Sequence, residues 1–243
     1  MRPISPFPKA ERPPATPGRA QPLAPTVAPT VAPTVALSEV FAETVADAGA
    51  VGFVLSRLVR GAAPVLWIQD RLSRRETGRP NLAGLGSLAG LGTCQVLLLD
   101  ITRPLDALIA AEEGLRCKGL SAVVAEIYGD PPGLDFTATK RLALRAEATG
   151  VPCWLIRHGG TADLSAARDR WRIGALPSVP NPDDERAPGD PCWRVELFRS
   201  RHRQPGIWVA RHDRAADRVD LVAAVPDGTV AAGATAGGQR SHR

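Results

Sequence analysis

The chain is poor in the residues on which most metal sites and many hydrolases depend. It has four cysteines and four histidines among 243 residues. The cysteines are widely spaced, without the close CxxC pairs of zinc sites, and no HxxxH pattern is present. Nothing in the sequence resembles a catalytic triad. We therefore expect neither a metal enzyme nor a hydrolase, and we interpret the cysteines as free thiols in a reducing compartment: Cys94, Cys117, Cys153 and Cys192.

Long apolar runs are also missing. No run approaches the roughly 20 residues that a membrane-spanning helix needs. Near Met1 there is one arginine followed by prolines, without the apolar core of a signal peptide. We expect a cytoplasmic protein that does not contact a membrane.

The positive charge is concentrated outside the central part of the chain. The formal net charge is +5, and most of it comes from residues 1–36 and 226–243. A basic balance indicates nucleic-acid binding when it comes from a folded surface. The total charge is therefore a poor guide to a partner here.

Proline and glycine divide the chain into three parts. Residues 1–36 are rich in proline and contain the repeat APTVAPTVAPTVA, and residues 226–243 are rich in glycine and alanine. Proline at the density of the first segment is incompatible with helix or sheet, and ordering the second segment would cost conformational entropy, so we expect both terminal segments to be disordered. The first is either an inert linker or a proline-rich ligand. Residues 37–225 form the predicted domain.

Within that domain, short apolar runs alternate with helical patterns. Alternation of this kind predicts an α/β fold with a mostly parallel sheet flanked by helices. Strand-like segments without intervening helices then predict antiparallel strands at the C-terminal edge. The predicted parallel strands are 37–41, 64–68, 95–100, 121–127 and 152–157, the helices are 50–61, 104–119 and 134–150, and the later strands are 171–176, 193–201, 206–213 and 218–225. One further short helix is expected within 69–94.

The loop after the first strand is the first candidate site. P-loop proteins place GxxxxGK[ST] there, so that backbone amides and a lysine hold phosphate groups. Here Gly49 and Gly52 are present, but Phe53 and Val54 follow, and neither side chain can bind phosphate or Mg²⁺. The alternative is that the glycines allow close packing at the start of a helix.

Acidic residues at strand ends form the second candidate. Glu126 lies near the end of the strand 121–127, where a Walker-B acid would position Mg²⁺. Asp100, at the end of the strand 95–100, is the rival.

The helix 104–118 carries the third candidate. Glu112 and Arg116 fall within an apolar stripe that contains Leu105, Leu108, Ile109 and Leu115. They form either an i,i+4 ion pair or a polar contact with a partner protein.

A basic stretch after residue 193 is the fourth candidate. Arg199, Arg201 and Arg203 alternate, so they would share one face of a strand near Trp193 and Phe198. They would bind nucleic-acid phosphates or, alternatively, protect an edge strand from aggregation.

Several segments together resemble the bacterial ImuA family. The most specific are EEGLRC (112–117), AVVAEI (122–127) and LDFTATKRLALRAE (134–147), and the similarity extends over roughly residues 37–213. The resemblance implies a RecA-like fold and a role in SOS mutagenesis and DNA repair. It implies association with ImuB, an inactive relative of Y-family polymerases, and with an error-prone C-family polymerase in translesion synthesis. RecA and DNA are further candidate partners.

The resemblance also assigns places to the candidate residues. It puts residues 52–54 in the place of the GKT triplet of RecA and Glu126 in the place of the Walker-B aspartate. Because the lysine is missing, we expect a pseudo-ATPase without a cofactor, acting as a non-catalytic adaptor. The alternatives are a SulA-like cell-division inhibitor that binds FtsZ and a weak RecA-like ATPase.

Overall fold

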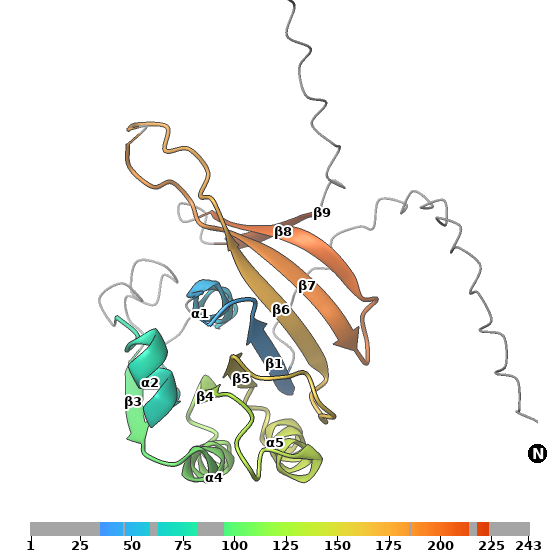
Figure 1. Cartoon of the computed structure of the whole chain (residues 1–243). Helices are drawn as coiled ribbons and strands as arrows, with labels where there is room; N and C mark the ends of the chain where they lie inside the picture. The colour runs from blue at the N-terminus through green and yellow to red at the C-terminus, as the bar shows by residue number, and fades with distance from the viewer. Residues whose placement is uncertain are drawn as a thin grey trace, which may run out of the picture.

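The described chain forms one mixed β-sheet with helices on both faces (Figure 1). A computed structural model describes residues 35–45, 47–58, 63–81, 95–184, 186–213 and 218–223. The segment 226–243 and all of 1–36 except its last two residues lie outside the described residues. Their expected disorder therefore stays a prediction.

Nine strands make up the sheet, in the order β3-β2-β4-β5-β1-β6-β7-β8-β9. The pairings from β3 to β6 are parallel, and those from β6 to β9 are antiparallel. The expected α/β class, with antiparallel strands after a parallel sheet, is confirmed. The strands are β1 (Leu37–Ala42), β2 (Val65–Asp70), β3 (Val96–Ile101), β4 (Ala122–Tyr128), β5 (Cys153–His158), β6 (Asp169–Leu176), β7 (Cys192–Ser200), β8 (Gly206–Asp213) and β9 (Arg218–Ala223).

The helices cover the two faces of the sheet unequally. Helices α4 (Pro104–Gly114) and α5 (Phe136–Thr149) pack on one face, while α1 (Gly49–Leu55) packs on the other. The short helix expected within 69–94 is α2 (Arg71–Thr77), which follows β2 directly. Among the described residues, none of these helices has the length and apolarity to cross a membrane.

Local sequence signals explain the ends of α5. The Asp135 side chain accepts a hydrogen bond from the Ala138 amide at 2.8 Å, which satisfies a free donor of the first turn. Gly150 follows with a positive φ of 80°, the conformation in which helices commonly stop. The helix was predicted one or two residues too long at each end.

One other prediction of extent was wrong. Helix α4 ends at Gly114, before the expected stop at Gly119, and its last residue packs tightly on β2: a side chain at Gly114 would lie 2.5 Å from Cδ2 of Leu66. Strand β3, although continuously apolar in sequence, is the edge strand of the sheet, and Leu97 is 48% exposed.

The apolar core is divided by the sheet. On the α1 side, tryptophans from five strands fill the space: Trp67, Trp154, Trp171, Trp193 and Trp208. On the α4–α5 side, the core consists mainly of alanine and small aliphatic side chains. On the α1 side, large aromatic rings therefore determine how closely α1 and its loop can pack against the sheet.

Candidate functional site

A carboxylate of the chain itself occupies the entrance of α1, where a P-loop would hold phosphate. Asp47 Oδ1 accepts the Gly49 amide at 2.6 Å, and its Oδ2 accepts the Ala175 amide at 2.6 Å. Free amides at the start of a helix are what a phosphate group requires. Asp47 takes one of these amides and places a negative charge beside the others.

The two glycines of this loop pack against one tryptophan. A side chain at Gly52 would lie 2.9 Å from Cζ2 of Trp193, and one at Gly49 would lie 3.1 Å from Cδ1 of the same ring. Both distances are shorter than ordinary van der Waals contacts. This geometry favours the alternative interpretation, in which the glycines allow a close approach.

Phe53, which follows Gly52 in α1, belongs to the core. Its ring centroid lies 5.4 Å from that of Trp171 and 6.4 Å from that of Trp154, and the side chain is fully buried. Val54 is fully buried too. Neither side chain faces a space where a nucleotide could bind.

Glu126 lies in a buried polar network made by three neighbouring strands. Its Oε1 accepts from Trp67 Nε1 at 2.5 Å and from Gln69 Nε2 at 3.0 Å, and its Oε2 lies 2.8 Å from His158 Nε2. All four side chains are at most 1% exposed. Three donors thus surround the carboxylate, which leaves it poorly placed to bind a metal ion.

Sequence reasoning missed the roles of Trp67 and His158 in this network. Both lie in apolar strand segments, so their sequence context predicts ordinary core residues. Only the register brings them together: Gln69 is level with Glu126 on adjacent strands, and Tyr128 is level with His158. The rival acid Asp100 lies on the edge strand and pairs with Arg74 at 2.9 Å and with Arg79.

The predicted pair between Glu112 and Arg116 is not formed. Glu112 instead reaches across to α5, 3.3 Å from Arg141 and 3.6 Å from Arg145, while Arg116 lies 3.4 Å from Glu113. The i,i+4 pair does not form because α4 ends at Gly114, which leaves Arg116 beyond the helix.

The apolar stripe of α4 also divides into two faces. Leu108 and Leu115 are buried, whereas Leu105 is 45% exposed and Ile109 is 50% exposed. The exposed pair lies beside Glu112 on the outer side of α4, and this side therefore remains a candidate partner surface.

Arg199, Arg201 and Arg203 do not share one face of a strand. Strand β7 ends at Ser200, so Arg201 and Arg203 lie in the turn that follows, and a register shift occurs between Arg170 and Trp171 of the adjacent β6. Arg203 turns back, with its Nε 3.8 Å from Asp169 Oδ2. Arg199 and Arg201 are exposed.

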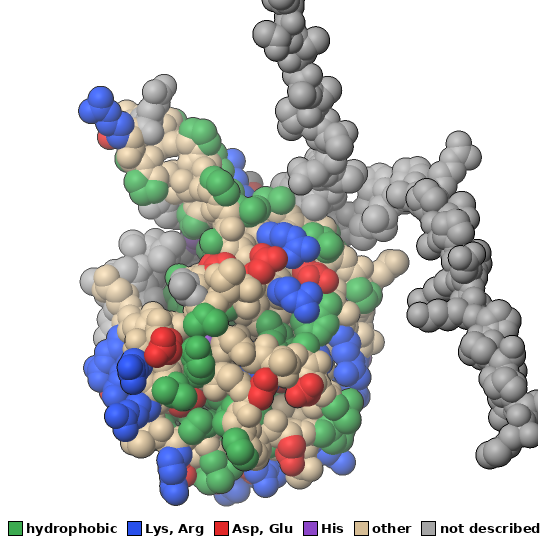
Figure 2. Space-filling model, viewed as in Figure 1, with side chains coloured by type: hydrophobic (Ala, Val, Ile, Leu, Met, Phe, Trp, Pro, Cys, Tyr) green, Lys and Arg blue, Asp and Glu red, His purple; other side chains and the backbone are tan. Residues whose placement is uncertain are grey.

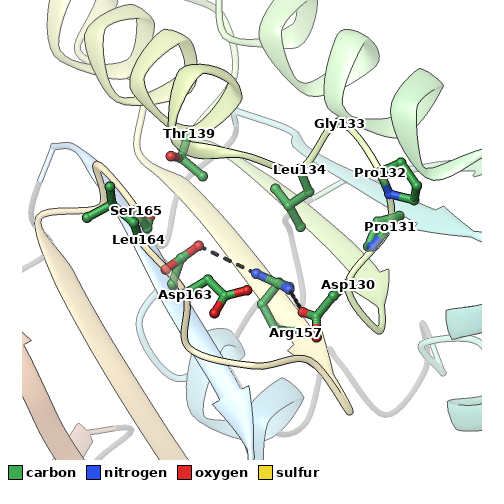
Figure 3. Close-up of a pocket in the computed structure, with 11 residues that line it drawn as sticks. Asp130, Pro131, Pro132, Gly133, Leu134, Thr139, Arg157, Asp163, Leu164 and Ser165 are labelled. Carbon is green, nitrogen blue, oxygen red and sulfur yellow. Dashed lines mark hydrogen bonds and ion pairs between the residues drawn. The ribbon is translucent and has the colours of Figure 1, made fainter.

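A cavity of about 230 Å³ lies between the loops that follow β4 and β5 (Figure 3). Arg157 extends into it and pairs with Asp130 at 2.5 Å and with Glu39 at 3.8 Å. Burial lowers the pKa of Arg157, and the two carboxylates oppose that change. Because the carboxylate of Asp130 also accepts the Thr161 amide at 2.9 Å, this network holds the two loops together.

No protein-family model matches the chain. The protein is similar to Protein ImuA from two strains of Caulobacter vibrioides, NA1000 and CB 15. In each case the identity is 36% over 183 residues, which is 69% of this chain and 70% of the Caulobacter protein. An identity of this size over more than two thirds of both proteins confirms the resemblance seen in the sequence, and the chain belongs to the ImuA family.

Proposed function

We propose that this protein is a non-catalytic, RecA-like accessory protein of a DNA-damage-induced translesion synthesis complex. The observation that carries the proposal is the state of Glu126. Glu126 is the carboxylate that would position Mg²⁺. In this ImuA-family chain it is buried and hydrogen-bonded to Trp67, Gln69 and His158.

The fold supports a RecA-like origin. Strand β1 lies inside a parallel sheet and leads directly into α1, as a P-loop arrangement requires. Ligands of open α/β sheets bind at the carboxyl ends of the strands, and Glu126 lies near that end of β4.

The entrance of α1 supports the loss of nucleotide binding. Asp47 would repel a phosphate group at the place where the glycine-rich loop would hold it. Phe53 replaces the lysine and is part of the core. Both changes would have to be reversed to restore nucleotide binding, so we assign no cofactor to the protein.

Family membership and the altered site together support the accessory role. The partners that we propose are an ImuB-like protein and, through it, an error-prone C-family polymerase. A fold that no longer binds nucleotide can still serve as a surface to which partner proteins bind.

The test is co-purification of the full chain with the ImuB homologue of the same organism. FtsZ is used as a second bait in a parallel experiment. ATP turnover is measured on the same protein sample. Binding to the ImuB homologue without ATP turnover would support the proposal. Binding to FtsZ alone would favour the SulA-like alternative. Turnover above background would favour the weak ATPase.

A further inference from the structure

The end of β7, the turn that follows it and the residue before β6 present a group of basic side chains, here named the arginine corner: Arg168, Arg199, Arg201 and His202. The Ser200 hydroxyl donates to Asp169 at 2.6 Å. The same oxygen accepts the amides of His202 at 3.1 Å and Arg203 at 2.9 Å. The Arg201 amide donates to the Arg168 carbonyl oxygen at 3.0 Å. These bonds fix the backbone from which the side chains extend.

The arginine corner has more positive than negative charge. Arg199, Arg201 and His202 are exposed, and their side chains have no ion-pair partner among the described residues. Arg168 pairs with Glu147. The pKa of Glu147 is lowered first by its hydrogen bond to Arg168, and the charges of Arg201 and His202 contribute as well. Two carboxylates therefore lie at this turn, Glu147 beside Arg168 and the buried Asp169 beside Arg203, while Arg199 and Arg201 add two further positive charges.

This arrangement differs from the other arginine groups of the fold. Arg74 and Arg79 converge on Asp100, and Arg172 pairs with Glu196 at 2.8 Å. In Figure 2, Lys and Arg side chains gather over α2 and also at the opposite side, where Figure 1 draws the end of β7. Arg74 and Arg79 bind an acid of the chain, whereas Arg199 and Arg201 are left for an external anion.

Arginine is suited to phosphate because its planar guanidinium donates two parallel hydrogen bonds to one phosphate group. The corner contains no lysine, the backbones of Arg168 and Arg201 are hydrogen-bonded, and Arg199 lies two residues before Arg201. Single-stranded nucleic acid is bound by such rows of cations, which follow the phosphate backbone without reading the bases.

We infer that the arginine corner is a binding site for the phosphate backbone of single-stranded nucleic acid. Arg199 and Arg201 contact phosphate groups directly, from a turn whose backbone is held by Ser200 and by the Arg168 carbonyl oxygen. The site lies at the end of β7, in the antiparallel part of the sheet, away from the network around Glu126. The inference deepens the proposed function because it adds a nucleic acid to the complex, and it is tested without any partner protein.

The experiment uses the full chain and a fluorescently labelled 30-nucleotide poly-dT, with binding followed by anisotropy between 50 and 200 mM salt. The test variant is Arg199→Gln/Arg201→Gln. The matched control is Arg71→Gln/Arg75→Gln, which removes the same charge from exposed positions on α2. We expect the test variant to bind at least tenfold more weakly at about 100 mM salt. The slope of the logarithm of the binding constant against the logarithm of salt concentration should become shallower by roughly 1.4, for two lost phosphate contacts. The control should change affinity less than twofold.

Three outcomes would overturn the inference. The unmodified chain could fail to bind the oligonucleotide even at the lowest salt. The two double variants could lose affinity equally, which would indicate attraction by total charge. Poly-glutamate could bind the corner more tightly than the oligonucleotide, which would indicate an acidic protein as the partner. A failure here leaves binding to the ImuB homologue unaffected, so the two proposals are tested separately.

Discussion

Trp67 donates its indole N–H to the carboxylate of Glu126 at 2.5 Å, within a core that excludes water from both side chains. The bond joins β2 to β4 on the side of the sheet that faces α1. It gives Glu126 a structural role, and the first prediction follows from it.

Replacing Glu126 with alanine should destabilise the fold. The substitution leaves the donors of Trp67, Gln69 and His158 without an acceptor in a buried site, which costs about 3 kcal/mol. Glu126→Gln keeps one oxygen acceptor and should cost less. Urea denaturation of both variants measures the difference. Equal stability of Glu126→Ala and the unmodified protein would show that the network contributes nothing, and would return Glu126 to the list of candidate metal ligands.

Gly52→Ala should destabilise the protein through contact with Trp193. The added methyl group would lie 2.9 Å from the indole ring, and overpacking of a core typically costs about 1–3 kcal/mol. In a Trp193→Leu background the same change should cost clearly less, because the ring is absent. A double-mutant cycle measured by thermal or urea unfolding gives this coupling. Additive effects would mean that the glycine is required for another reason.

Restoring the phosphate-binding sequence should not restore nucleotide binding. The double change Phe53→Lys/Val54→Thr places an ammonium group where Phe53 now contacts Trp154 and Trp171. We expect a loss of more than about 3 kcal/mol in unfolding free energy, because the charge would be buried without a partner. Calorimetric titration with ATP and Mg²⁺ should show no binding by the folded fraction. A stable variant that binds ATP would contradict the assignment of this loop to the core.

Ile109→Glu should weaken binding to the ImuB homologue by at least tenfold while the fold remains intact. Ile109 is 50% exposed on α4, so the change should alter stability by less than about 0.5 kcal/mol. It tests the helix better than Glu112→Arg, because Glu112 holds Arg141 and Arg145 of α5. The control is Ile207→Glu, at a similarly exposed position on β8. Unchanged binding of the Ile109 variant would remove α4 from the interface.

Cys153 should resist alkylation in the folded protein, whereas Cys117 should react. Burial raises the pKa of Cys153 to about 12, and Cys117 is exposed. Because the raised pKa belongs to the folded state, its contribution to stability is complete below the pKa of an unfolded thiol, near 8.5, and declines as the pH rises above that value. Mass spectrometry after iodoacetamide treatment at pH 8, with and without urea, measures the reactivity of each thiol. Rapid modification of Cys153 without denaturant would contradict its burial.

The alternation of apolar runs and helical patterns was sufficient to predict nearly every described strand and its direction. Strands such as Ala122–Tyr128 are buried on both faces, so their sequences are continuously apolar and easy to recognise. Pro104 and Gly150 likewise marked a helix start and a helix stop. These signals are local, and local signals are readable from one sequence.

The site residues were harder to predict because their partners are distant in the chain. Glu112 was assigned to Arg116, four residues away, but its partners are on α5. The arginine row was assigned to one strand because nothing in the sequence showed that β7 ends at Ser200. The network of Glu126 depends on strand register, which is set by the packing of the whole sheet.

The position of β1 has a consequence for the order in which the protein can form. Leu37 pairs with Cys153 of β5 on one side, and Ser38 pairs with Asp169 of β6 on the other. While the chain emerges from the ribosome, this early apolar strand has neither neighbour until the later half has been translated. Contacts so distant in sequence form slowly, and unpaired strand edges invite aggregation in the meantime. In the nascent chain, β1 can therefore enter the sheet only after β5 and β6 have been synthesised. A chain truncated before β6 should be insoluble and should not fold as a smaller domain.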